Sequence, residues 1–384
     1  MSEQYIVSAR KYRPMRFDEV VGQGHVTQTL KNALKSGHIA HAFLFCGPRG
    51  VGKTTCARIL AKTLNCENRT ADFEPCNECD SCKSMNRNAS FNIIEQDGAS
   101  NNKVEDIRDL VGHVHAAPPK GNYKVFIIDE VHMLSSSAFN AFLKTLEEPP
   151  AHAIFILATT EKHKILPTIL SRCQIYDFKP IEVENIKSHL AKIAEEEQIT
   201  AEPEALHLLS EKADGALRDG LSLFDRIVSA TDGHVTYEAV IENLNILDHH
   251  SYFELSDALL QQDIPTTLQL FDSILRKGFE AELVINGLGN HFRDLMISKD
   301  PMTTKLMELG GKIQERYIEQ SELFSLSFLL TALQLINECD STFERARNKR
   351  LHAEMTLCKL AMIESVRKAE PFQDASAKKS LSEL

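Results

Sequence analysis

The chain has 384 residues, of which 43% are hydrophobic and 25% are charged, and its formal net charge is −11 at pH 7. This length is sufficient for two or three domains with buried cores, and the composition is that of an ordinary globular protein. A protein that binds nucleic acid through phosphate contacts alone is usually basic, so we expect any such contact here to be local or shared among subunits.

The sequence gives no indication of a membrane or secreted protein. The longest apolar-rich stretch, residues 323–336, is interrupted by polar side chains and is too short to span a bilayer. Residues 1–4 do not begin a secretory signal, so we expect a cytoplasmic protein with no membrane partner. Disulfides are disfavoured in that compartment, and five of the nine cysteines are expected to be buried small side chains: Cys46, Cys56, Cys173, Cys339 and Cys358.

Residues 1–179 alternate apolar runs with helical patterns. The runs 42–47, 91–97, 124–129 and 153–160 are almost continuously apolar, as expected for parallel strands covered on both faces. Helical patterns such as 54–65 and 136–148 separate them. This order predicts an α/β domain with a doubly wound parallel sheet and helices on both faces.

The segment GPRGVGKT, residues 47–54, follows the first predicted strand and begins a helix. It fits the phosphate-binding loop pattern in full, and a chance glycine-rich turn is disfavoured by this context. Lys53 could reach the β- and γ-phosphates of ATP, and the Thr54 hydroxyl could bind Mg²⁺. The candidate nucleotide-binding residues of this loop are Gly47, Pro48, Arg49, Gly50, Val51, Gly52, Lys53, Thr54 and Thr55.

The segment KVFIIDEVH, residues 124–132, ends a predicted strand in two carboxylates. Asp129 could hold Mg²⁺, directly or through water, and Glu130 could act as the general base toward an attacking water. Solvated acids at a strand end are the alternative for this segment taken alone. Together with the phosphate loop, the two acids predict nucleotide hydrolysis.

Four cysteines lie between a predicted helix and the next strand, at Cys66, Cys76, Cys79 and Cys82. Overlapping C-x-x-C units suit a tetrahedral zinc ion, and four cysteine ligands leave no position for water. The spacing therefore predicts structural zinc that folds an insertion at residues 66–82 and takes no part in catalysis. A redox C-x-x-C pair and an iron–sulfur site remain as alternatives.

After residue 180 the pattern is helical, with no convincing strand. We predict a small helical domain at 180–246, an all-α domain at 247–368 and a disordered tail at 369–384. Two sets of residues are each expected to share a helix face: Leu268, Phe271 and Leu275 in one helix, and Leu351, Met355, Cys358 and Met362 in another.

Several basic residues have two possible roles. Arg172 follows a short predicted helix, and Arg218 begins another. A lone arginine is most often solvated at the surface, but it can also stabilise charge on a transferring phosphoryl group. The run from Arg10 to Arg16 could contact nucleic acid or adenine, with a solvated face as the alternative.

Taken in order, these motifs closely resemble the bacterial DNA polymerase III gamma/tau subunits. The segments that carry the resemblance are ARKYRPMRFDEVVGQ (9–23), the phosphate loop, the four-cysteine insertion, DGASNNKVEDIRDL (97–110), FIIDEVHMLS (126–135), FNAFLKTLEEPP (139–150), ATTE, TILSRC and GALRDGLSL. The resemblance implies an AAA+ ATPase domain over 1–179, a helical lid over 180–246 and an oligomerising collar over 247–368. It also implies a ring with delta and delta-prime subunits and further copies of the chain, which uses ATP to load the beta sliding clamp onto primed DNA.

Further residue roles follow from the resemblance alone. Thr160, or alternatively Thr159, would be the sensor at a strand end, Arg172 an arginine finger toward a neighbouring subunit's ATP, and Arg218 the sensor of the lid. Val20 and Val21, within the segment 20–23, would lie near adenine. Gly24 and Gly220 depart from the family pattern, where an acidic residue and a small residue such as alanine are common.

Members of this family are classified with the DNA-directed DNA polymerase III holoenzyme, but no polymerase site is visible in the sequence. The chain ends at residue 384, so we expect a motor without the polymerase- and helicase-binding domains of the long family form. Two other functions stay open. One is an AAA+ motor of the branch-migration type, and the other is a scaffold that binds ATP for assembly only.

Overall fold

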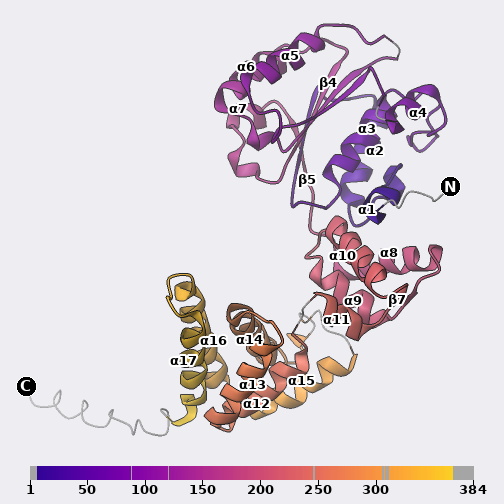
Figure 1. Cartoon of the computed structure of the whole chain (residues 1–384). Helices are drawn as coiled ribbons and strands as arrows, with labels where there is room; N and C mark the ends of the chain where they lie inside the picture. The colour runs from indigo at the N-terminus through magenta and orange to yellow at the C-terminus, as the bar shows by residue number, and fades with distance from the viewer. Residues whose placement is uncertain are drawn as a thin grey trace, which may run out of the picture. The chain divides into compact units, whose positions relative to one another are not determined.

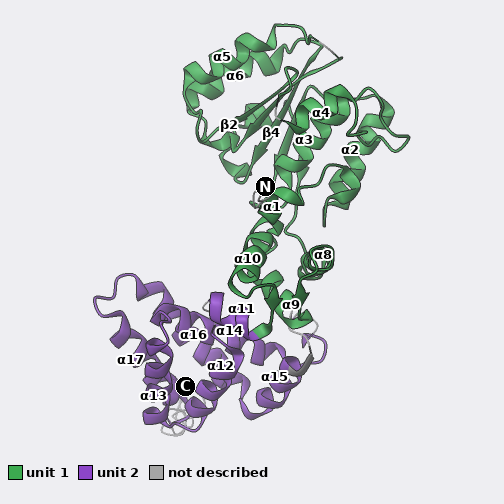
Figure 2. Ribbon diagram, turned by 45° about the vertical axis from the view of Figure 1, so that its right-hand side comes forward, with its two compact units in different colours: residues 1–237 green, residues 238–384 purple. Residues whose placement is uncertain are grey.

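The computed structural model describes residues 7–365, except 88, 120, 245, 246, 305, 306 and 308–310. It contains two compact units, residues 1–237 and 238–384 (Figure 2). The tail predicted at 369–384 lies outside the described residues, and the domain boundaries predicted near 180 and 247 stay predictions.

The first unit contains a parallel sheet of five strands in the order β2-β3-β4-β1-β5 (Figure 1). This confirms the predicted doubly wound fold. The strands are β1 (Ala42–Cys46), β2 (Ile93–Asp97), β3 (Lys124–Asp129), β4 (Ala153–Thr159) and β5 (Gln174–Asp177). Strand β5 was not predicted, because it lies at the sheet edge and only Tyr176 of its four residues is buried.

Helices cover both faces of this sheet (Figure 1). One face is covered by α2 (Gly24–Ser36), α3 (Lys53–Leu64) and α4 (Asp80–Asn86), which pack on alternate strand residues such as Phe43 and Phe45. The other face is covered by α5 (Val104–Val114), α6 (Ser136–Glu147) and α7 (Pro167–Leu170), which pack on the intervening residues such as Leu44. Because both faces are buried, the strands lack polar alternation.

Shorter elements precede and connect these layers. Helix α1 (Ser8–Lys11) and the 3₁₀ helix η1 (Phe17–Glu19) come before α2, and η2 (Val131–Met133) and η3 (Lys162–Lys164) follow β3 and β4. The Ser8 backbone N–H donates to the Asp225 carboxylate at 2.7 Å. Helix α1 is therefore tied to the helical part of the first unit.

That helical part contains α8 (Val183–Glu196), α9 (Pro203–Lys212) and α10 (Leu217–Ala230). Our expectation of no strand after residue 180 was wrong, since β6 (Thr200–Ala201) pairs in parallel with β7 (His234–Val235). Strands of two residues are too short to leave a periodic pattern in the sequence. At Gly220, a Cβ atom would lie 3.2 Å from that of Ala213, so the helices approach closely there.

The described part of the second unit contains only helices. They are α11 (Tyr237–Leu244, whose first residue belongs to the first unit), α12 (His249–Leu260), α13 (Ile264–Arg276), α14 (Ala281–Ile297), α15 (Gly311–Leu323), α16 (Leu326–Phe343) and α17 (Lys349–Ala361). Phe271 is buried in the core of this unit, as are Leu357 and Leu360 of α17. Leu351 and Met355, which we expected to share a face, are each 52% exposed, so they lie on the outer side of α17. Within the described residues, no helix combines the length and apolar character needed to cross a membrane.

Candidate nucleotide site and cysteine cluster

The phosphate loop connects the carboxyl end of β1 to the first turn of α3. Gly47, Gly50 and Gly52 have φ angles of 146°, 78° and 104°, which side chains with a Cβ rarely adopt. At Gly47 a Cβ would also lie 2.4 Å from the carbonyl oxygen of Phe178. Glycine is therefore required for the loop to close, and the N-terminus of α3 is directed toward the space that anionic phosphates would occupy.

Lys53 lies at the start of α3 with its ammonium group over the loop. Its Nζ donates to the carbonyl oxygens of Gly47 at 2.7 Å and Pro48 at 2.6 Å. Burial lowers the pKa of Lys53, and the nearby carboxylates of Glu130 and Asp129 act in the opposite direction. The lysine is thus held next to the loop, in position to meet phosphate oxygens.

The two predicted halves of the site meet directly. The Thr54 hydroxyl donates to Oδ2 of Asp129 at 2.6 Å, although the two residues are 75 positions apart. Oδ1 of Asp129 accepts the backbone N–H of Glu130 at 3.0 Å. A hydroxyl and a carboxylate in contact form an oxygen ligand set suited to Mg²⁺ beside a nucleotide.

Glu130 follows β3 with φ 46° and ψ 45°, a left-handed conformation that is uncommon outside glycine. Its Oε2 accepts the Thr160 hydroxyl at 3.1 Å and lies 3.4 Å from the Thr160 backbone nitrogen. The neighbouring Thr159 is fully buried, and its hydroxyl accepts the backbone N–H of Glu161 at 3.0 Å instead. Of the two threonines that we considered as sensor, Thr160 is the one that contacts the candidate base.

His132 also belongs to this cluster, although we assigned it no role from the sequence. Its side chain is 6% exposed, and its Nδ1 lies 3.0 Å from the Thr159 hydroxyl and 3.4 Å from Oε2 of Glu130. Its Nε2 lies 3.3 Å from Oε1 of Glu161. In the sequence, the one indication of a role for His132 was its position three residues after Asp129. The short helix η2 turns the chain there, so the His132 side chain lies beside the ends of the strands.

Arg13 contacts the site as well, so the basic run near the N-terminus is more than a solvated face. Its Nε donates to the Thr55 hydroxyl at 3.3 Å. Burial, with Arg58 and Arg218 nearby, lowers the pKa of Arg13. Closer to the loop, a Cγ of Val20 lies 3.9 Å from where Gly52 would carry a Cβ. Val21 is partly buried in the following turn.

The structure places the two candidate arginines differently. Arg218 lies in the first turn of α10, and its backbone N–H donates to the carbonyl of Gly50 at 3.4 Å, which brings the helical region against the phosphate loop. Arg172 lies after α7, where its guanidinium donates to the carbonyl of Thr168 at 2.6 Å and to Glu147 at 2.7 Å. Among the described residues, its contacts include none from its own phosphate loop.

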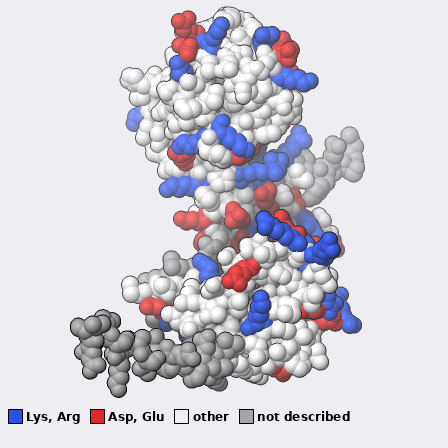
Figure 3. Space-filling view, turned by 90° about the vertical axis from the view of Figure 1, so that its left-hand side faces the viewer, with Lys and Arg blue, Asp and Glu red and all other residues white. Residues whose placement is uncertain are grey.

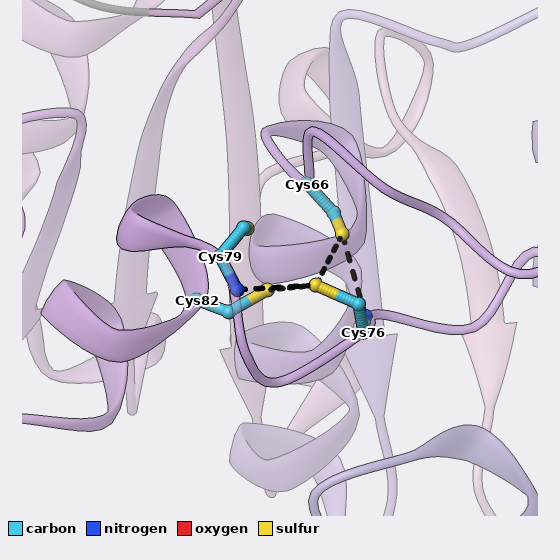
Figure 4. A group of neighbouring side chains, drawn as sticks. All are labelled: Cys66, Cys76, Cys79 and Cys82. Atoms are coloured by element: carbon cyan, nitrogen blue, oxygen red, sulfur yellow. Dashed lines mark hydrogen bonds between the residues drawn. The ribbon is translucent and has the colours of Figure 1, made fainter.

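Cys66, Cys76, Cys79 and Cys82 converge, with all four sulfur atoms within 4.8 Å of one another (Figure 4). Backbone N–H groups point at the sulfurs, from Cys76 to Cys66 and from Cys79 to Cys76, each at 3.3 Å. Burial opposes ionisation of the Cys76 thiol, but the N–H groups of Cys79 and Glu78 outweigh it and lower its pKa to about 6. Burial raises the pKa of Cys66 and Cys82, so the case for a metal rests on geometry: four converging sulfur atoms fit a tetrahedral ion such as zinc.

The five remaining cysteines differ in burial. Cys46, Cys56 and Cys339 are buried, as we expected, whereas Cys173 and Cys358 are only partly buried.

Lys and Arg side chains on the face drawn in Figure 3 alternate with Asp and Glu rather than forming one basic surface among the described residues there.

Three family models match successive parts of the chain. Residues 22–182 match the model described as DNA polymerase III, delta subunit. Residues 185–233 match the ATPase lid domain of the DNA polymerase III clamp loader subunit. Residues 235–373 match domain III of DNA polymerase III subunits gamma and tau.

Curated relatives agree with these models. DNA polymerase III subunit gamma of Buchnera aphidicola is 41% identical, over 73% of this chain and 78% of the relative. The tau subunits of Escherichia coli and Bacillus subtilis are 46% and 40% identical, over 77% and 91% of this chain. The chain spans 46% and 62% of the length of those two tau subunits. Among solved structures, the RuvB Holliday junction branch migration motor of Thermotoga maritima aligns with a TM-score of 0.46 and 19% identity, over 65% of this chain and 79% of that one.

Proposed function

The chain belongs to the family of DNA polymerase III gamma and tau subunits, and we propose that it is the ATP-hydrolysing motor subunit of a clamp loader. In this role it would load the beta sliding clamp onto primed DNA during chromosomal replication. The observation that carries the proposal is the direct contact between Thr54 of the phosphate loop and Asp129 of the acidic pair, at 2.6 Å.

We infer that ATP binds with its phosphates in the loop formed by residues 47–54. The backbone N–H groups at the start of α3 and the Lys53 ammonium would neutralise phosphate charge. Mg²⁺ held by Thr54 and Asp129 would supply charge neutralisation at the β- and γ-phosphates. Val20, which lies next to Gly52, and Val21 would contact the adenine ring.

Glu130 is the proposed general base. Its carboxylate lies one residue beyond Asp129 and is held by Thr160, so it can accept a proton from water while remaining oriented. Thr160 would report the state of the γ-phosphate to this carboxylate. His132 would also restrain this carboxylate, because its Nδ1 lies 3.4 Å from the same oxygen, Oε2.

Arg172 is the proposed arginine finger for the ATP of a neighbouring subunit. Its exposed position, paired with Glu147 and away from its own phosphate loop, supports a role between subunits. Arg218, which begins the helix that contacts Gly50, would link the lid to the bound nucleotide. Arginine suits both roles because its planar guanidinium binds phosphate oxygens with defined geometry.

The four cysteines would hold structural zinc, since all the ligand positions are taken by sulfur. The proposed partners are delta and delta-prime subunits, further copies of the chain, the beta clamp and primed DNA, in the bacterial cytoplasm. The matched ranges support a division into an ATPase domain at 1–179, a lid at 180–246 and a collar at 247–368.

The proposal is tested by steady-state ATP hydrolysis. The chain is assayed alone and then with delta, delta-prime, clamp and primed DNA. We expect strong stimulation by the full set, and we expect Glu130→Gln to bind ATP but turn it over slowly. A rate that the full set leaves unchanged would contradict the motor function and would leave an ATP-binding scaffold.

A further inference from the structure

One buried acidic residue of the cysteine insertion contacts residues outside the insertion. Glu74, inside the 66–82 insertion, is 1% exposed. Its Oε2 accepts the backbone N–H of Phe17 at 2.8 Å, and its Oε1 accepts that of Asp18 at 3.2 Å. The ammonium of Lys31, from α2, lies 2.5 Å from Oε1. A buried carboxylate with three donors is well satisfied, and these donors come from two separate elements.

The residues that Glu74 holds begin a segment that runs past the nucleotide site. We call residues 17–23 the strap. At its other end Gln23 is fully buried, and its side-chain amide donates to the Lys179 carbonyl at 2.7 Å and accepts the Lys179 N–H at 3.3 Å. Between these anchors, Val20 lies beside Gly52 of the phosphate loop.

The insertion in turn depends on its cysteines for a defined shape. Between Cys66 and the start of α4 it has no regular element, and Phe73 and Asn77 adopt φ angles of 59° and 60°. Glu74 itself is placed by a turn in which its N–H donates to the Thr70 hydroxyl at 3.0 Å. Because this turn lies between the first two cysteines, releasing them would free Glu74 to move away from the strap.

We propose that Glu74 is a positioning residue that connects the cysteine insertion to the strap, so that metal binding at the cluster and ATP binding at the phosphate loop strengthen each other. The identification of ATP as the ligand of the phosphate loop rests on the proposed function. Because the proposed function places Val20 of the strap against adenine, the coupling acts on the adenine side of the nucleotide more than on the phosphates. By thermodynamic linkage, ATP must then tighten metal binding by the same factor.

The test compares Glu74→Gln with Glu78→Gln in the full chain. Both changes remove one acid from the same insertion, but Glu78 is exposed. Affinities for Mg²⁺-ATP and for Mg²⁺-tripolyphosphate are measured by competition against a fluorescent ATP analogue, and zinc content is measured by metal analysis. For Glu74→Gln we expect about tenfold weaker ATP binding, the loss that removing about 1.4 kcal/mol produces. Tripolyphosphate affinity and zinc content should stay at wild-type values, and Glu78→Gln should match wild type throughout.

Unchanged ATP affinity in Glu74→Gln with full zinc content would overturn the inference. An equal loss for ATP and tripolyphosphate would also overturn it, because that result indicates general damage to the loop. A wild-type chain that binds no ATP would instead contradict the proposed function.

A second measurement tests whether metal binding at the cysteines stabilises the contacts of Glu74 with the strap, and it needs neither nucleotide nor a variant. Hydrogen exchange at the amides of Phe17 and Asp18 is compared in metal-loaded and metal-stripped wild-type protein. Loss of protection there, with the rest of α2 and the sheet still protected, supports the connection. Unchanged protection overturns it.

Discussion

Thr160→Val is expected to lower ATP turnover without weakening ATP binding. Valine has nearly the shape of threonine but cannot donate a hydrogen bond, so the change removes only the hydroxyl contact to Oε2 of Glu130, at 3.1 Å. The Glu130 carboxylate would then keep only longer contacts among those described, from the Thr160 backbone nitrogen and from Nδ1 of His132, each at 3.4 Å. A general base that is poorly oriented loses rate rather than affinity.

The size of the effect follows from the geometry. Hydrogen bonds to charged groups contribute about 1.5–3 kcal/mol, and the low end applies here because the bond is long and the Glu130 side chain is 30% exposed. A loss of about 1.5 kcal/mol in the transition state lowers kcat by about tenfold.

The assay is steady-state hydrolysis in the reconstituted complex, alongside equilibrium ATP binding to the chain. Thr159→Val is the comparison, because that hydroxyl contacts the Glu161 N–H and His132 and reaches the base only indirectly, through His132, so a smaller loss of rate is expected. We expect it to lower thermal stability more than Thr160→Val does, since Thr159 is fully buried. The reasoning would be refuted if Thr160→Val left kcat unchanged or raised only the Kd for ATP.

Three further results are expected. Arg172→Ala should abolish the stimulated ATP hydrolysis of the assembled complex, whereas Arg108→Ala, a change at another exposed arginine, should not. Because the ion pair of Arg172 with Glu147 is exposed, the free energy of unfolding of Arg172→Ala in a denaturant titration should differ from wild type by less than about 1 kcal/mol. Cys79→Ser should lower bound zinc and the midpoint of thermal unfolding, and retention of one zinc per chain at wild-type stability would contradict the four-sulfur site. Burial lowers the pKa of His291 from 6.5 to about 3, so the unfolded chain gains a proton that the folded one lacks, and stability should fall by about 1.4 kcal/mol per pH unit as pH drops below 6.5. His291→Gln should lower the slope of stability against pH in this range by about 1.4 kcal/mol per pH unit, and an unchanged slope would refute the assignment.

Sequence patterns predicted those parts of the molecule where neighbours in the chain act together. The phosphate loop was predictable because its glycines and Lys53 occupy a few consecutive positions between a strand and a helix. The acidic pair was predictable because it ends a continuous apolar run. The cysteine cluster was predictable because its four cysteines lie within one short segment, at the C-x-x-C spacing that is typical of metal ligands.

Other features depend on contacts between distant residues and leave little local pattern. Strand β5 contributes a single buried side chain, Tyr176, so it has no apolar run to detect. Arg13 looks like part of a solvated basic segment until the fold brings Thr55 beside it. Glu74 looks like any surface acid, since its partners Phe17 and Asp18 lie more than fifty positions earlier. Their roles follow from three-dimensional packing, which periodicity does not encode.

The partners of Ser8 and Gln23 are synthesised long after these two residues, which delays the formation of both contacts. The partner of Ser8 is Asp225, 217 positions later, and the partner of Gln23 is Lys179, 156 positions later. At a ribosomal rate of about 5–20 residues per second, Ser8 waits roughly ten to forty seconds for Asp225 to be made. The contacts of Ser8 and Gln23 therefore form only after residues 225 and 179 have been synthesised.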